Sequence, residues 1–119
     1  GVADLKRMLK DGRSRYGSNH WVISYWERQF GGDEFDRDAL DDISPITFAD
    51  KFEAPVLLIH GKKDLVVPIE QSKAMNKALR KAGKDVTLVE LKGEDHYLSY
   101  SETRLATLQA LAAFIEMHL

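Results

Sequence analysis

The chain has 119 residues, of which 44% are hydrophobic, and its formal net charge is −2. This length suits one domain with one core, and the composition predicts a packed fold rather than a disordered chain. The near-neutral charge argues against nucleic acid or an anionic membrane surface as a partner, and the absence of cysteine excludes disulfides and thiolate metal sites.

The amino-terminal end carries no signal peptide, and no apolar run approaches the roughly 18 residues that span a bilayer. The first residue is Gly1 rather than Met, so we expect this chain to be a piece of a longer protein. The cytoplasm is the expected compartment. The periplasm and the cell exterior stay open, because the amino terminus of the parent is missing.

The first half of the chain is polar, charged and aromatic. Residues 4–11 and 19–30 are predicted as short helices, separated by glycines at 12, 17, 31 and 32. Residues 34–42 are acidic and predict another short helix, and Ser44-Pro45 predicts a turn. We interpret residues 1–52 as a helical connecting region, with the acidic run Asp33–Asp42 as a solvated face.

The second half, residues 53–119, predicts the order strand, helix, strand, helix. The continuous apolar run at 56–60 is typical of a strand buried on both faces, and 86–91 reads as a second strand. Between them, residues 68–82 have helical spacing and end at Gly83. For the last helix, Ser99 and Glu102 predict a capping box. Its predicted apolar face consists of Leu105, Leu108, Ala112, Ile115 and Leu119.

This order predicts an α/β fold with parallel strands joined by a right-handed crossover. Two strands do not form a stable sheet alone, so the sheet is expected to be incomplete within this chain. The missing strands are expected in the remainder of the parent chain. As an isolated fragment, the chain is expected to form a homo-oligomer or a strand-exchanged dimer that covers the open edges.

Two polar loops follow the two predicted strands. Asp64 lies five residues after Ile59, and His96 lies five residues after Leu91. Neighbouring parallel strands bring such loops to the same edge of a sheet, so the carboxylate and the imidazole are expected to meet. A carboxylate that accepts from Nδ1 of a histidine orients that ring as a general base. We therefore predict Asp64 and His96 as catalytic residues.

The stretch LLIHGKKDLVVPIEQS at 57–72, followed by LKGEDHYLS at 91–99, resembles the end of an α/β-hydrolase catalytic domain. More narrowly, it resembles the prolyl oligopeptidase-like serine peptidases of the acylaminoacyl-peptidase and dipeptidyl-peptidase branch. The stretches GVADL, YWERQFG and ISPITFADKFEAPVLLIHG are also similar to that branch. This resemblance implies that Asp64 is the acid and His96 the base of a Ser-Asp-His triad. Tyr97 departs from the family, in which a small residue often follows the histidine.

The serine nucleophile of such enzymes lies in a G-x-S-x-G turn, and the chain contains no such motif. The stretch from Gly12 to Gly17 has one residue too many around Ser14. The resemblance places the serine upstream of Gly1. The parent would then hydrolyse short peptides from their amino terminus without a cofactor or metal, and the fragment alone would be inactive.

Other interpretations of these residues remain. Asp64 could cap its turn, and His96 could be an ordinary loop histidine. We interpret His60 as structural, and His20 and His118 as surface residues. A metal site of Asp64, Glu94 and His96 matches no known ligand spacing. The aromatic group on 21–30 predicts core or interface packing.

Two other functions use the same pattern. An esterase or a dienelactone-hydrolase-like enzyme shares the triad, and a non-catalytic binding domain could retain the fold.

Overall fold

Two parallel strands lie at the centre of the computed structural model, which describes all residues except the side chain of Asp33. Strand β1 (Val56–Gly61) pairs with β2 (Val86–Leu91), with Val56 opposite Val86 and Gly61 opposite Leu91. Within the described residues these two strands make up the whole sheet, so each has an unpaired edge. The predicted α/β class and parallel pairing are confirmed.

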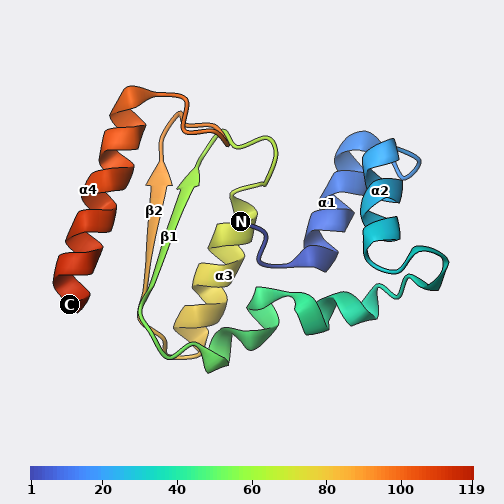
Figure 1. The fold of residues 1–119 in the computed structure, drawn as a ribbon, viewed down its shortest axis with the longest axis horizontal. Coiled ribbons are helices and arrows are strands. Elements are labelled where there is room, and N and C mark those ends of the chain that lie inside the picture. Colours follow the sequence, from blue (N-terminus) through green and yellow to red (C-terminus); the bar gives the residue numbers. More distant parts are fainter.

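Helices cover the two faces of this sheet. Helix α3 (Glu70–Lys81) connects the strands and packs on one face, and α4 (Ser101–His118) lies along the other (Figure 1). Gly83, at φ +71°, stands one residue beyond the C-cap of α3, as predicted from the sequence. This crossover places the carboxyl ends of both strands at the same edge of the molecule.

The buried core lies between α3 and the sheet. Helix α3 shows its apolar spacing clearly, because Met75 and Leu79 on its inner face are 5% and 0% exposed. Burying a side chain such as Leu79 contributes roughly 1.5–3 kcal/mol. The other buried members of this cluster are Ala3, Ala49 and Val86.

The first half of the chain is helical, as predicted, but with different boundaries. Helix α1 spans Leu5–Tyr16, and α2 spans Trp21–Gln29. Gly12 does not end α1, contrary to expectation. It lies inside the helix, where an added Cβ would stand 3.1 Å from Cδ1 of Ile23 on α2. The glycine therefore lets the two helices approach each other.

Three short 3₁₀ helices return the chain from α2 to β1: η1 (Gly32–Glu34), η2 (Asp38–Ile43) and η3 (Pro45–Lys51). The single acidic helix expected at 34–42 is thus wrong, since this stretch contains the end of η1 and most of η2. The turn expected at Ser44-Pro45 is the junction between η2 and η3, where Pro45 takes the first helical position.

Two buried polar side chains attach the amino-terminal segment to the rest. Gln71 on α3 accepts from the backbone N–H groups of Ala3 (2.9 Å) and Asp4 (2.8 Å), and it donates to the Asp4 carbonyl (3.0 Å). Ser44 accepts from N–H of Leu5 at 3.0 Å. These bonds fix where α1 begins, next to the start of α3.

Helix α4 differs from its sequence prediction in both its cap and its buried side. The expected capping box is absent among the described contacts, because the Ser99 hydroxyl donates to Asp95 (2.6 Å) and α4 begins two residues later. The predicted apolar face is exposed, with Leu105 57% and Leu108 63% exposed. The half-buried side of α4 carries mostly smaller or partly polar residues: Thr103, Ala106, Thr107, Ala110, Phe114 and His118.

The molecule is flat, with principal extents of 48 × 33 × 19 Å. Its radius of gyration is 16.0 Å, larger than the roughly 13.5 Å expected of a compact domain of this length. Helices α1 and α2 extend away from the sheet as a separate pair (Figure 1). No helix of the described chain is both long and apolar enough to cross a bilayer.

Candidate active site

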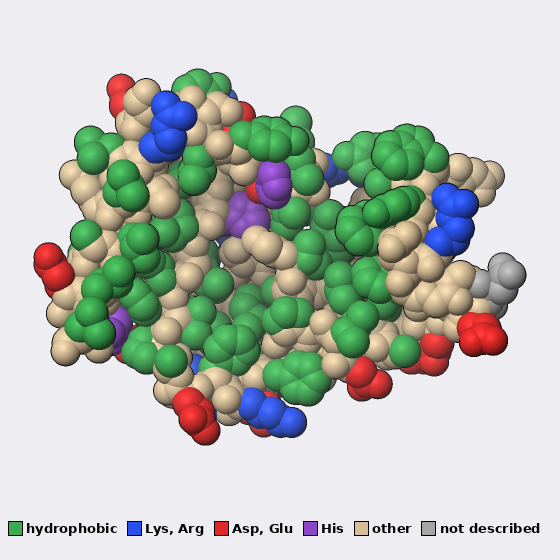
Figure 2. All heavy atoms as spheres, viewed as in Figure 1, with side chains coloured by type: hydrophobic (Ala, Val, Ile, Leu, Met, Phe, Trp, Pro, Cys, Tyr) green, Lys and Arg blue, Asp and Glu red, His purple; other side chains and the backbone are tan. Residues whose placement is uncertain are grey.

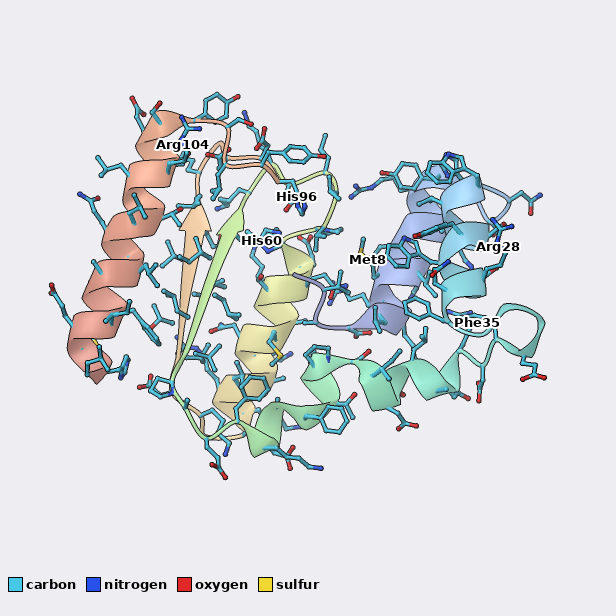
Figure 3. All side chains as sticks on the ribbon, viewed as in Figure 1. Met8, Arg28, Phe35, His60, His96 and Arg104 are labelled. Atoms are coloured by element: carbon cyan, nitrogen blue, oxygen red, sulfur yellow. The ribbon has the colours of Figure 1, made fainter. Side chains whose placement is uncertain are left out.

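The two loops predicted to meet do lie together at the carboxyl ends of β1 and β2. Oδ2 of Asp64 is 2.8 Å from Nδ1 of His96. Figure 3 shows His96 beside His60 at this edge of the sheet. The structure therefore brings together both residues that the sequence predicted for the site.

The Asp64 carboxylate is held by its own loop. Its Oδ1 atom accepts from the N–H groups of Val66 (2.9 Å) and Val67 (2.8 Å), and 6% of the side chain is exposed. Burial by itself raises the pKa of Asp64. The hydrogen bonds from His96, Val67 and Val66 outweigh that effect, so the pKa lies below its ordinary value of 3.8. Asp64 is thus an anion at neutral pH.

His96 is oriented by this anion. An ionised carboxylate only accepts hydrogen bonds, so Nδ1 of His96 donates to Asp64. This assignment leaves Nε2, on the other edge of the ring, as the nitrogen that can take a proton. The side chain is 35% exposed, and the Tyr97 ring stands edge-on to it with centroids 5.3 Å apart.

His60, near the end of β1, contacts both Asp64 and the loop that carries it. Its Nε2 atom lies 2.8 Å from the Val67 carbonyl, which can only accept, so Nε2 carries the proton. The same atom is 3.3 Å from Oδ2 of Asp64, and Nδ1 is 2.7 Å from the Ser72 hydroxyl. His60 is buried, with 3% of its side chain exposed. This agrees with the structural role predicted from the sequence.

The histidine loop is held by Glu94, which belongs to the family-like stretch 91–99 but for which the sequence predicted no positioning role. Glu94 is 0% exposed. Its carboxylate accepts from the N–H groups of Asp95 (2.8 Å), Ser99 (3.0 Å) and Tyr100 (3.3 Å), and from the Thr103 hydroxyl. The available signal was an acid placed two residues before the candidate base and shortly before a helix.

The two loops are also joined through their backbones. N–H of Lys63 donates to the Glu94 carbonyl at 2.8 Å. A Cβ on Gly61 would stand 2.5 Å from that same oxygen and 2.6 Å from the Asp95 carbonyl. Only glycine allows this approach, so Gly61 sets the distance between the acid and histidine loops.

One hollow is lined by the pair, and a second begins at the residue after Asp64. A small one of about 170 Å³ is lined by residues from both loops, among them Asp64 and His96. A larger one, about 460 Å³, lies between α1, α2 and the stretch just after Asp64. Figure 2 shows apolar side chains gathered over the α1–α2 side of this region. Its lining is almost wholly apolar and includes Tyr16, Val22, Trp26, Phe30, Leu65, Val66 and Val67.

The remaining predicted residues lie outside the pair. His20 caps the start of α2 and His118 ends α4, and both are half-buried rather than fully at the surface. Among the described side chains, no three carboxylates or imidazoles are grouped so as to hold a metal ion. In the aromatic group, Trp26 and Phe30 line the larger hollow, whereas Trp21 is 70% exposed.

The chain is similar in sequence to known proteins. The sequence model of the prolyl oligopeptidase family matches residues 1–119. The uncharacterised peptidase YuxL of Bacillus subtilis is 34% identical over 99% of this chain and 19% of its own length. An uncharacterised protein of the same organism, YqkD, is 29% identical over 63% of this chain and 24% of its own length.

A solved structure gives the same result. A puromycin-hydrolysing peptidase of Mycobacterium tuberculosis superposes on the whole chain with a TM-score of 0.80 and 30% identity. The chain covers 17% of that protein, so it spans about a fifth of the length of these peptidases. With a family match over all 119 residues, the chain belongs to the prolyl oligopeptidase family.

Proposed function

We propose that this chain is the C-terminal part of a serine peptidase that hydrolyses short peptides through a Ser-Asp-His triad. Asp64 is the acid and His96 the base. The observation that carries the proposal is the 2.8 Å contact between Asp64 and His96, at the carboxyl ends of two parallel strands. Family membership supports peptide hydrolysis as the reaction.

The geometry of the pair supports separate roles for the serine, His96 and Asp64. A serine attacks the peptide carbonyl carbon while its hydroxyl proton passes to Nε2 of His96. The resulting imidazolium is stabilised by the Asp64 anion, and it then gives the proton to the departing amine. Water then attacks the acyl-serine. His96 takes a proton from this water and gives it to the departing serine oxygen, which regenerates the enzyme.

The nucleophile is proposed to lie upstream of this chain. No G-x-S-x-G motif occurs in the 119 residues. The serines whose hydroxyls are engaged near the site serve other partners, since Ser72 contacts His60 and Ser99 donates to Asp95. The fragment alone is therefore proposed to be inactive.

The large hollow supports a preference for apolar substrates. It begins at Leu65 and Val66, immediately after the acid, and its walls are apolar and aromatic. A substrate bound at His96 could place an apolar side chain there, which would remove it from water. Puromycin, which the mycobacterial relative hydrolyses, is a suitable first probe.

Labelling with a fluorophosphonate tests the triad. The full-length protein should react at one serine upstream of Gly1, and the isolated 119-residue chain should stay unlabelled. Stoichiometric labelling of a serine within the chain would contradict the proposal. A panel of aminoacyl anilides and simple esters then tests the reaction class, because faster turnover of plain esters would indicate an esterase.

The open surfaces support association with further protein. Both strands have a free edge, and the outer side of α4 is apolar (Figure 2). In the parent, the remainder of the chain is proposed to cover them, and in the isolated fragment a second copy is proposed to do so. Sedimentation of the fragment as a monomer at high concentration would contradict the second part. The exposed residues on this side of α4 are Leu105, Leu108, Leu111, Ile115 and Leu119.

A further inference from the structure

We propose that Glu94 is a positioning residue for His96, one that fixes the base through the loop and never touches the substrate. This inference rests on the proposed function of the Asp64–His96 pair. Glu94 has the lowest exposure in its loop, and it is a carboxylate rather than an apolar residue. A carboxylate at such a place is costly unless every lone pair is used, so its contacts indicate its role.

The donors to Glu94 lie on both sides of the base. One oxygen accepts from N–H of Asp95, immediately before His96, and from N–H of Ser99, three residues after it. The other oxygen accepts from N–H of Tyr100 and from the Thr103 hydroxyl in the first turn of α4. Residues on both sides of His96 therefore donate to the one carboxylate of Glu94, which holds the two ends of this loop together.

The start of α4 supplies the counter-charge. Tyr100 is the N-cap residue of α4, and its own side chain makes no capping bond. Glu94 lies beside this helix start, where it accepts from the N–H of Tyr100 and from the Thr103 hydroxyl. A carboxylate at a helix N-terminus is also stabilised by the helix dipole. Burial by itself raises the pKa of Glu94, but the bonds from Thr103 and the three N–H groups outweigh it, so the pKa lies below its ordinary value of 4.5.

The same residue joins the base to the acid. The Glu94 carbonyl accepts from N–H of Lys63, the residue before Asp64, at 2.8 Å. Its side chain thus sets the histidine loop, and its backbone sets the spacing to the acid loop. A displacement of Glu94 would change the distance from Asp64 to His96, which is the distance on which the proposed base depends.

The test uses Glu94→Gln in the full-length protein, with Glu90→Gln as the matched control. Glu90 lies on β2, and its ion-pair partners Lys62 and Lys73 are both outside the histidine loop. Glu94→Gln replaces one acceptor oxygen with an NH₂ group, which cannot accept and would face two of the four donors. We expect kcat to fall by about 10–100-fold with KM unchanged, as for a misplaced catalytic group. Glu90→Gln should leave both constants within about twofold, since an exposed ion pair contributes little.

A second pair of variants changes only one donor. Thr103→Val removes the hydroxyl that donates to Glu94 and that also lies 2.9 Å from the Tyr100 carbonyl, whereas Thr103→Ser keeps it. Thr103→Val should lower kcat by about 5-fold, less than Glu94→Gln, because it removes one of the four donors to Glu94, and Thr103→Ser should restore kcat. Equal values for these two variants would contradict a role through this bond.

A measurement independent of turnover separates this inference from the proposed function. In protein labelled with ¹⁵N-histidine, the proton on Nδ1 of His96 should give a downfield resonance, because it is bonded to Asp64. Glu94→Gln should abolish or broaden that resonance, and Glu90→Gln should preserve it. If Glu94→Gln lowers only the unfolding temperature and leaves kcat and the resonance intact, the inference is wrong. Absence of peptidase activity in the wild type would overturn the proposed function alone, since the resonance still reports on Glu94.

Discussion

The acid loop and the histidine loop meet at one edge of the sheet but are held in different ways. Asp64 is fixed from nearby, by two N–H groups of its own turn and by His60 at the end of the same strand. His96 depends on Glu94, whose partners reach into the first turn of α4. Asp64 thus has local support, whereas the position of His96 depends on the packing of a helix that comes later in the chain.

This difference matters if Asp64 and His96 work as the proposed catalytic pair. A local turn forms from a few neighbouring residues, so the position of Asp64 is tolerant of changes elsewhere. The position of His96 requires α4 to be docked, because three of the four donors to Glu94 come from residues 99–103. Substitutions in the two loops should therefore differ in their effects on kcat and on stability.

The largest expected effect comes from removing the acid itself. Asp64→Asn in the full-length protein should lower kcat by about 10⁴-fold, because an amide can hold His96 in the wrong tautomer. The fold should remain, as the carbonyl of Asn still accepts from the turn. Asp85→Asn, an exposed carboxylate at the opposite end of the strands, is the control and should change kcat little. Retention of wild-type kcat by Asp64→Asn would refute the triad.

A smaller effect is expected from forcing the loops apart. In Gly61→Ala, the new Cβ would overlap the carbonyls of Glu94 and Asp95, so the loops must separate. We expect about a 100-fold loss of kcat and about 1–3 kcal/mol of stability. Gly12→Ala is the comparison, since its Cβ would press on the Ile23 side chain between α1 and α2 and leave the contact between the two loops in place. Chemical denaturation and steady-state kinetics on both variants check this. Equal losses of stability and of kcat in the two variants would argue against Gly61 as the residue that sets the distance between the loops.

Acid should destabilise both loops through their carboxylates. The folded pKa values of Asp64 and Glu94 lie below their ordinary values of 3.8 and 4.5. Their ionised forms therefore add stability above those values, and this contribution is lost as pH falls through the folded pKa values. The thermal midpoint of the wild type should fall more steeply below pH 4.5 than that of Glu94→Gln. Parallel slopes for the two proteins would exclude Glu94 as a source of acid sensitivity.

The smallest effect is expected at the support of His60. Ser72→Ala removes the partner of Nδ1, but Nε2 still donates to the Val67 carbonyl. We expect a loss of about 1 kcal/mol in stability and little change in kcat. Urea denaturation together with steady-state kinetics measures both. A large drop in kcat would show that the acid loop relies on His60 more than its local bonds suggest.

The sequence predicted the α/β order and the meeting of Asp64 with His96, because both depend on short-range patterns. Continuous apolar runs indicate buried strands, and the topology of a strand–helix–strand unit then fixes which loops lie together. The N-terminal boundaries were less well predicted. Glycine often ends a helix, but Gly12 lies inside α1 and permits close contact with Ile23 on α2.

The sequence by itself determined the elements of the second half and the contact between Asp64 and His96, because apolar periodicity and loop position suffice for both. Only the tertiary structure decided the role of Glu94, since a carboxylate in a loop normally indicates a solvated residue. It also decided which side of α4 meets the sheet. That helix is apolar around most of its circumference, so its periodicity indicates no single buried face, and packing against the strands selects Ala110 and Phe114 over Leu108.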